Sequence, residues 1–276
     1  MLNRTDLALE SAESVRTNGE LPKGILIDVE RSADFEVTTV RITEDEASER
    51  IGKPKGTYIT VESKNRLDFP SEISERQIKT LSKILRSLID DKKNVLVIGL
   101  GNDDITPDSL GVRTAKNIFA TRHIKEHAPE ALDVRTGDVS VLITGVMGKT
   151  GIESSDVVKA VCERIKPSCV IAVDALACSD ASHLGKTVQI TDTGISPGSG
   201  VANSRRELSI STLGVKCIAI GIPTVCDLNN GSDLMVTPRT IDKMIFKSTR
   251  LLSGSINRAL HPNMSSKELE ILTEQI

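Results

Sequence analysis

Four short, almost continuous apolar runs constrain the fold of this chain more than any other feature of its sequence. They are NVLVIGL (94–100), VSVLITGV (139–146), CVIAVDAL (169–176) and VKCIAIGIP (215–223). Segments with helical spacing of apolar residues separate them, around 108–122 and 152–165. Such runs are typical of parallel strands that are buried on both faces. We therefore predict an α/β fold with a mostly parallel central sheet and helices on both faces.

The first part of the chain has a different pattern. GILIDVE (24–30) and FEVTTVRI (35–42) predict a hairpin, and GTYITVES (56–63) predicts a third strand after the short helix TEDEASERIG. These strands predict a small antiparallel β region ahead of the parallel core.

Two longer helices are predicted outside the parallel strands. Apolar residues recur at mostly helical spacing from Pro70 to about Asp91, which indicates a long amphipathic helix. Near the end, TPRTIDKMIFKSTRLLSGSINRAL predicts another, with Thr237 as its N-cap and Pro238 at its first position.

The composition excludes several classes of function. Lys and Arg total 35 against 38 Asp and Glu, so the net charge of −3 provides no basic surface for nucleic acid. Aromatic residues make up only 2% and Trp is absent, which argues against a base-stacking surface. No run of about 18 apolar residues occurs and the N-terminus lacks a secretory signal, so we expect a cytoplasmic protein without a membrane partner.

Cysteines and histidines give no metal or cofactor signature. The five cysteines contain no CxxC pair, and several lie in apolar runs, which favours reduced thiols in the core. His123 and His127 have helical spacing but lack the HExxH context of a zinc protease, so a solvated helix face is favoured over a metal site.

Two aspartates stand where an α/β sheet binds its ligands, beyond the carboxyl ends of the strands. In GLGNDDITPDSLG, glycines permit a tight turn and Asp108 should lie near a helix N-terminus. Asp174 interrupts an apolar strand, where a carboxylate is costly unless it faces a cavity or a partner. Each also has a structural interpretation: Asp108 could cap a helix, and Asp174 could be a buried acid held by backbone N–H groups.

A third acid lies in Asp192-Thr193-Gly194, the tripeptide of pepsin-like and retroviral aspartic proteases. Its surroundings, VQITDTGISPGSGVANSRRE, are typical of a polar, glycine-rich loop and not of the β-barrel lobe that those enzymes require. We interpret Asp192 as a loop or substrate-groove residue.

The same segment contains further candidates for substrate binding. Gly198, Ser199 and Gly200 could provide backbone donors for a peptide. Arg205 and Arg206 could meet acidic substrate side chains, although an ordinary solvated surface explains them equally well.

Several long blocks, in order along the chain, are more specific than any single motif. They are VIGLGNDDITPDSLG, TGVMGKTGIESSDVV, CVIAVDALACSD, ITDTGISPGSGVANSRRELS, LGVKCIAIGIPTVCD and DLMVTPRTIDKMI. Together they resemble the germination proteases of spore-forming bacteria, from Arg4 to about residue 260. The resemblance implies an atypical aspartic endopeptidase, similar in fold to the hydrogenase maturation endopeptidases, whose two catalytic aspartates fall on Asp108 and Asp174.

The resemblance also implies a substrate and a zymogen. The substrates would be small acid-soluble spore proteins in the spore core, cut after an acidic residue and before a hydrophobic one followed by Ala; a homo-oligomer is expected. Thr5-Asp6-Leu7-Ala8 looks like such a site, so we predict self-cleavage between Asp6 and Leu7. Residues 1–6 would be a pro-segment and 7–276 a single peptidase domain, with an accessory β region at 24–63 and a catalytic core at 94–260.

Alternatives stay open at this point. Asp6 could instead cap a short N-terminal helix and never be cut.

The mechanism also has alternatives. Paired carboxylates suit hydrolysis, because one can activate water while the other, protonated, polarises the carbonyl. A metal-dependent processing peptidase would need a histidine beside the acids, for which His183 is the only loose candidate. A noncatalytic ligand-binding module is the remaining interpretation.

The chain departs from the family pattern in two segments. CDLNNGSD (226–233) makes a short connection where the family has a longer one, and Ser196 stands where relatives often have histidine. A histidine in that loop is therefore not essential here.

Overall fold

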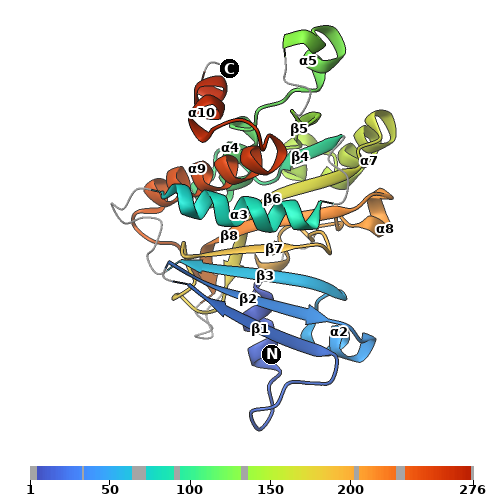
Figure 1. The fold of residues 1–276 in the computed structure, drawn as a ribbon. Coiled ribbons are helices and arrows are strands. Elements are labelled where there is room, and N and C mark those ends of the chain that lie inside the picture. Colours follow the sequence, from blue (N-terminus) through green and yellow to red (C-terminus); the bar gives the residue numbers. More distant parts are fainter. Residues whose placement is uncertain are drawn as a thin grey trace.

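One mixed sheet runs through the molecule (Figure 1). The computed structural model describes residues 5–32, 34–63, 73–89, 94–131, 136–201, 205–227 and 234–274. Within this part of the chain the strand order is β1-β2-β3-β7-β8-β6-β4-β5, and β9 pairs with β8. The strands are β1 (Ile25–Arg31), β2 (Phe35–Ile42), β3 (Gly56–Ser63), β4 (Val95–Gly99), β5 (Val139–Ile143), β6 (Cys169–Cys178), β7 (Thr187–Thr191), β8 (Cys217–Asp227) and β9 (Met235–Val236).

The four apolar runs form the parallel core, as predicted. Strand β4 pairs in parallel with β5 and with β6, and β6 pairs in parallel with β8. Successive side chains enter opposite layers: Val97 and Ile171 belong to one buried cluster, and Leu96 and Val170 to another. Asp174 and Val170 lie in the same strand and are separated by an even number of residues, so their side chains point to the same side of the sheet. Asp174 therefore faces the layer that contains Leu96.

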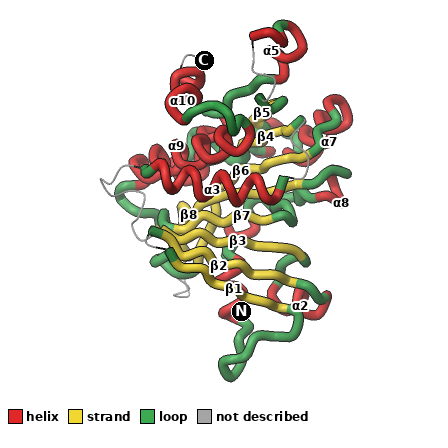
Figure 2. Tube along the Cα trace, viewed as in Figure 1, coloured by secondary structure: helices red, strands yellow, loops and turns green. Residues whose placement is uncertain are grey.

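Helices cover both faces of this core (Figure 2). The first layer contains α3 (Glu75–Leu88), α4 (Leu110–Lys116) and α9 (Ile241–Leu260), and the second contains α7 (Ser154–Ile165) and α8 (Ile210–Leu213). Two short helices, α1 (Ala8–Ser14) and α2 (Asp45–Ile51), pack with β1, β2 and β3. The remaining helices are α5 (Arg122–His127), α6 (Met147–Thr150) and α10 (Ser266–Glu274).

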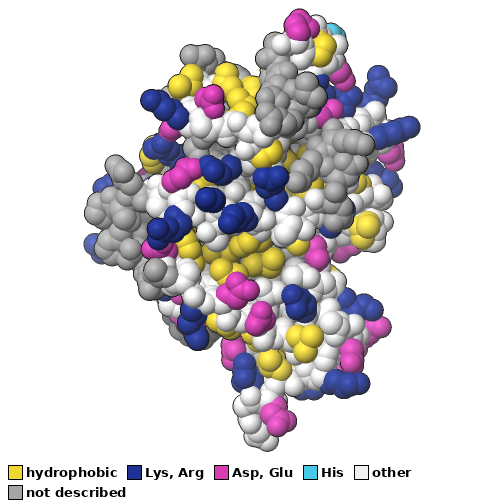
Figure 3. Space-filling view, in the orientation of Figure 1, with side chains coloured by type: hydrophobic (Ala, Val, Ile, Leu, Met, Phe, Trp, Pro, Cys, Tyr) yellow, Lys and Arg dark blue, Asp and Glu magenta, His cyan; other side chains and the backbone are white. Residues whose placement is uncertain are grey.

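Strand β7 joins the N-terminal β region to the parallel core, and the sequence interpretation of this segment as loop was wrong. It pairs antiparallel with both β3 and β8. All five of its residues are buried, and Val188 and Ile190 contribute to the larger core cluster. The predicted hairpin and third strand are therefore a continuation of the main sheet. Figure 3 shows this side of the molecule, with hydrophobic side chains gathered between α3 and the N-terminal strands.

Helix ends follow local capping chemistry. Ser74 and Gln77 form a reciprocal capping box that begins α3. The last long helix was predicted to begin after Thr237, but α9 begins at Ile241 with Thr240 at the N-cap position. The Thr237 hydroxyl instead donates to the carbonyl oxygen of Thr224, at 3.0 Å.

Two further predictions concern the state of the cysteines and the presence of membrane-spanning helices. All five cysteines lie in the described part of the chain, where each is buried and free. No helix of the described residues combines the length and apolar character that crossing a membrane would require.

Candidate functional site

A cavity of about 340 Å³ opens beyond the carboxyl ends of β4, β5 and β6. Asp108 and Asp174, the two acids predicted as catalytic, both line it. Asp6, Gly198 and Arg205 line the same cavity. The fold therefore brings together residues from widely separated parts of the sequence at the edge where α/β sheets bind ligands.

Asp108 closes a short 3₁₀ turn, Thr106–Asp108, immediately before α4. Ser109, not Asp108, occupies the N-cap position of that helix. Gly101 has a φ of 99°, and a Cβ added there would lie 2.0 Å from the Asp108 carbonyl oxygen, so this turn requires glycine. Burial raises the pKa of Asp108 to about 6, while a hydrogen bond from the backbone of Asn102 opposes the shift.

Asp174 lies within β6, opposite Gly221 of β8. Its side chain is buried, and one carboxyl oxygen accepts a hydrogen bond from the backbone N–H of Ala175, at 2.9 Å. Burial raises its pKa well above the ordinary value, and the charges of Asp108 and Asp6 raise it further. The two acids of the pair therefore interact, and their protons are lost one after the other.

The carboxylate of Asp6 is held inside this cavity. Its two oxygens accept hydrogen bonds from the backbone N–H of Ala177, at 2.8 Å, and from the hydroxyl of Ser199, at 2.7 Å. The backbone N–H of Asp6 in turn donates to the carbonyl oxygen of Ala177, at 2.9 Å. A Cβ added to Gly200 would lie 2.3 Å from the Asp6 carboxylate, so the close approach depends on glycine. The alternative in which Asp6 caps α1 is wrong, because Leu7 occupies the N-cap position.

The carbonyl oxygen of Asp6 belongs to the peptide bond predicted to be cut, and it accepts two further hydrogen bonds. Gln189 Nε2 donates at 2.7 Å and Lys53 Nζ at 3.0 Å. Burial lowers the pKa of Lys53, while the charges of Asp6 and Glu10 oppose that shift. An amide and an amine thus converge on one carbonyl oxygen.

Leu7 follows with its side chain completely buried. It packs in a small apolar cluster whose other members are Leu176, Cys178, Leu184 and Cys226. The next residue, Ala8, is equally buried, and its backbone N–H donates to Gln189 Oε1 at 2.7 Å. The segment around the predicted cleavage site is therefore held on both sides of the bond.

The remaining predicted residues separate into two groups. Gly198 and Arg205 line the cavity, where Arg205 Nη1 is 3.8 Å from the sulfur of Met147. Ser199 and Gly200 lie against the carboxylate of Asp6. Asp192 and Arg206 lie elsewhere among the described residues. Asp192 follows β7 and accepts a hydrogen bond from the backbone N–H of Thr57, at 2.8 Å. Arg206 forms an exposed ion pair with Asp156, at 3.2 Å.

His183 is engaged away from the two acids. Its Nδ1 lies 3.2 Å from the hydroxyl of Thr187, and its Nε2 lies 3.8 Å from a carboxylate oxygen of Glu10. Among the described residues, no group of three His, Cys, Asp or Glu side chains is arranged to hold a metal ion.

Sequence reasoning missed Lys53 and Gln189. Gln189 carried a weak signal, since it is a polar residue between apolar neighbours in VQI. Lys53 carried none, because a lysine after a short helix is ordinarily solvated.

Comparison with known proteins gives a consistent result over most of the chain. The sequence profile of the germination protease family matches residues 2–230. The germination protease of Caldanaerobacter subterraneus subsp. tengcongensis is 38% identical, with 98% of this chain and 97% of that one covered. That of Priestia megaterium is 39% identical, with 98% and 75% covered. A solved structure, the NiFe hydrogenase maturation protease HycI from Thermococcus kodakarensis, matches 64% of this chain and 98% of its own at 22% identity and a TM-score of 0.39.

Proposed function

Because the chain belongs to the germination protease family, we propose that it cuts small acid-soluble spore proteins with a water molecule activated by an aspartate pair. One observation carries this proposal: Asp6 lies in the cavity that Asp108 and Asp174 line, and its carbonyl oxygen already accepts two hydrogen bonds. Asp6, the first residue of the acid-Leu-Ala segment, thus lies close enough to affect the pKa of Asp174. We propose the spore core as its location and expect a homo-oligomer.

The two acids have different environments, and this difference supports different roles. With a pKa of about 6, Asp108 is mostly ionised at neutral pH and is suited to take a proton from water. The pKa of Asp174 is raised well above the ordinary value by burial, so this acid holds its proton more firmly than an ordinary carboxyl and is suited to donate it to the leaving nitrogen. No covalent intermediate is required.

The donors on the Asp6 carbonyl oxygen support a third part of the mechanism. Attack by water places negative charge on that oxygen, and preorganised donors stabilise such charge. Lys53 and Gln189 already lie at hydrogen-bonding distance, at 3.0 and 2.7 Å. We assign them the role of stabilising the tetrahedral intermediate.

Self-cleavage and cleavage of a separate peptide test the proposal together. After incubation, the purified protein is expected to begin at Leu7, and a peptide that copies residues 1–14 is expected to be cut after its sixth residue. N-terminal sequencing and mass spectrometry would identify both products. A noncatalytic binding module would leave both chains intact, which would overturn the proposal. Residues 1–4 of the predicted pro-segment lie outside the described residues.

The pH dependence of peptide cleavage follows from the two raised pKa values. Below a pH of about 6, Asp108 becomes protonated and can no longer act as the base, so kcat/KM is expected to fall with acidity. At higher pH the loss of the Asp174 proton removes the acid, so a second decline is expected. Initial rates measured from about pH 4 upward would show the decline on the acid side of pH 6. A rate that continues to rise below about pH 5 would contradict these roles.

Chelation is expected to leave the cleavage rate unchanged. The metal-dependent alternative needs a histidine beside the acids, but His183 is engaged with Thr187 and Glu10. The measurement is the rate of peptide cleavage after prolonged dialysis against a chelator. A loss of activity that zinc or nickel restores would favour the metal-dependent enzyme.

A further inference from the structure

Lys53, which donates to the carbonyl oxygen of Asp6, lies in the short turn between α2 and β3. Gly52, with a φ of 70°, ends the helix, and the hydroxyl of Ser48 donates to the Lys53 carbonyl oxygen at 2.7 Å. A lysine side chain is long and flexible and is ordinarily solvated. The hydrogen bond from Nζ to Asp6 therefore depends on how firmly this turn is held.

A chain of hydroxyl groups ends on the residue directly after Lys53. The Tyr58 hydroxyl donates to the carbonyl oxygen of Pro54 at 2.8 Å, and the Thr193 hydroxyl donates to that of Tyr58 at 3.2 Å. The hydroxyl of Thr191 lies 2.9 Å from that of Thr193. Because a hydroxyl group both donates and accepts, these side chains form a continuous chain from the end of β7 to the turn.

The middle of this chain is buried. Tyr58 is 3% exposed, and it belongs to the apolar cluster that packs α1 and α2 against β1, β2 and β3. Burial raises the pKa of Tyr58, while the hydrogen bond from Thr193 opposes the shift, so the hydroxyl keeps its proton for Pro54. A Cβ added to Gly56 would lie 2.3 Å from the methyl group of Thr193. The start of β3 and the turn after β7 are therefore in direct contact.

A second cavity, of about 140 Å³, lies between the hydroxyl chain and the N-terminal segment. Tyr58 and Thr193 line it together with Asp6, Lys53 and Gln189. The hydroxyl chain is thus adjacent to both donors that we assign to the Asp6 carbonyl oxygen.

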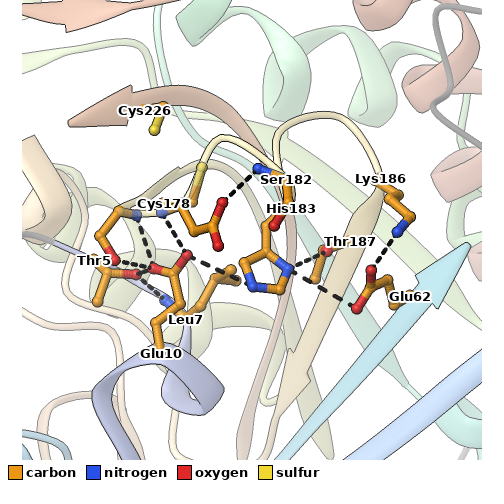
Figure 4. A network of polar contacts seen from close by, with 12 residues as sticks. Thr5, Leu7, Glu10, Glu62, Cys178, Ser182, His183, Lys186, Thr187 and Cys226 are labelled. Atoms are coloured by element: carbon orange, nitrogen blue, oxygen red, sulfur yellow. Dashed lines mark hydrogen bonds and ion pairs between the residues drawn. The ribbon is translucent and has the colours of Figure 1, made fainter. Parts of the chain in front are cut away.

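The N-terminal segment has anchors of its own, which Figure 4 shows. The Thr5 hydroxyl accepts from the backbone N–H of Leu7 at 3.0 Å and donates to the carboxylate of Glu10. That carboxylate in turn accepts from the backbone N–H of Ser179, at 2.8 Å. The carbonyl oxygen of Asp6 is therefore placed by the segment, and the lysine must be brought to it from the other side.

We propose that Tyr58 and Thr193 are positioning residues: their hydroxyl groups hold the turn at Pro54, and the turn holds the Lys53 amine against the carbonyl oxygen of the bond to be cut. The inference rests on the proposed function. Thr193 is the middle residue of the DTG tripeptide. This tripeptide thereby serves the reaction through a hydroxyl group that supports a donor, and not through its carboxylate.

Tyr58→Phe and Lys53→Met, made separately and together in the full-length protein, test the inference. Lys53→Met is expected to slow self-cleavage by about a hundredfold, because one preorganised donor is lost. Tyr58→Phe keeps the buried ring and is expected to slow it by about tenfold, because the donor is misplaced. In the Lys53→Met background, Tyr58→Phe is expected to have no further effect, because it acts through the lysine. Equal slowing by Tyr58→Phe in both backgrounds would overturn the inference.

A second variant reaches the same contact from its other end. Thr193→Val removes the hydroxyl that donates to Tyr58 and leaves the aromatic ring in place, so self-cleavage is expected to slow severalfold, again only when Lys53 is present. Ser82→Ala is the matched control. Its hydroxyl is also buried and donates to a backbone carbonyl oxygen, that of Lys79 at 2.9 Å, but it lies on α3. This variant is expected to cleave itself at the normal rate.

The pKa of Lys53 provides a readout that requires no cleavage. It is measured by NMR from the carbon shift of Lys53 Cε in Asp108→Asn, which is expected to keep its N-terminal segment. Burial lowers this pKa, and adding Tyr58→Phe is expected to move it back toward the ordinary value, because the amine returns to water. Adding Ser82→Ala is expected to leave it where it is.

These outcomes distinguish the inference from the proposed function. An unchanged pKa of Lys53 in the protein with Tyr58→Phe would overturn the positioning role and leave the protease function intact. A pKa that returns to the ordinary value, in a protein whose unmodified form cuts neither itself nor the peptide that copies residues 1–14, would support the positioning contact and overturn the proposed function.

Discussion

Asp174→Asn and Asp108→Asn are each expected to reduce peptide cleavage and self-cleavage by about 10²- to 10⁴-fold. Asparagine preserves the shape of the side chain but can neither take a proton from water nor donate one as a carboxylic acid does. Both acids line one cavity, and the proposed mechanism assigns the base to Asp108 and the acid to Asp174, so loss of either removes one of the two proton transfers. The measurement is the single-turnover rate on a peptide that copies residues 1–14.

Asp192→Asn is the matched control for this experiment. Asp192 belongs to the same residue type, but its carboxylate accepts a hydrogen bond from the backbone of Thr57, a role that an amide oxygen can also fill. Its cleavage rate is expected to stay close to that of the unmodified protein. Full activity in both Asp108→Asn and Asp174→Asn, together with loss in Asp192→Asn, would transfer catalysis to the third acid.

The Asp174→Asn variant is expected to lose cleavage activity without losing stability. The pKa of Asp174 is raised in the folded chain, so the folded state binds this proton more tightly than the unfolded state does. The free energy of unfolding of the unmodified protein therefore decreases as pH rises above about 4, and the asparagine variant lacks this decrease. Urea unfolding should show the variant to be the more stable protein, by more at about pH 8 than at about pH 5.

Gly200→Ala is expected to slow self-cleavage by about a hundredfold, because a misplacement of about 1 Å at a reacting bond has this effect. The added Cβ would lie 2.3 Å from the Asp6 carboxylate and 2.7 Å from the Cβ of Ala177. The Asp6 side chain would have to leave its present contacts with Ala177 and Ser199. A time course of the N-terminal sequence measures the effect.

Gly148→Ala is the matched control, since a Cβ added there would meet nothing within 4 Å. Both substitutions add one methyl group, and neither glycine has a positive φ. Self-cleavage of Gly148→Ala is expected at the normal rate. If Gly200→Ala also matched that rate, the contacts of Asp6 described above would have no part in cleavage.

The parallel core and the position of its cavity could be predicted from the sequence, because strands buried on both faces leave continuous apolar runs. Asp108 and Asp174, which line that cavity, were detectable for a related reason: one follows such a run and the other interrupts it, at the edge of the sheet where ligands bind. The extended hairpin strands were detectable from their β-branched residues. These are local signals.

The features that escaped prediction depend on contacts between distant segments. β7 is short, and its polar residues Thr187, Gln189 and Thr191 obscure its pattern, yet Gln189 is polar because it meets the backbone of Asp6 and Ala8. Lys53 donates a hydrogen bond to the carbonyl oxygen of Asp6 in the same segment. The start of α9 was misplaced because Thr237 binds Thr224, which lies 13 residues earlier. Nothing near these residues in the sequence indicates such partners.

The continuity of the sheet through β7 has a consequence for the order of events during synthesis. β3 can complete its pairing only with β7, which lies more than a hundred residues later, and the groups that hold Asp6 extend as far along the chain as Ser199. Pairings between distant segments form slowly and only after the intervening chain is available. A nascent chain on the ribosome therefore lacks the parts that grip its first residues. In the proposed self-cleavage, the N-terminal segment is therefore synthesised first but can be cut only after the later strands have paired.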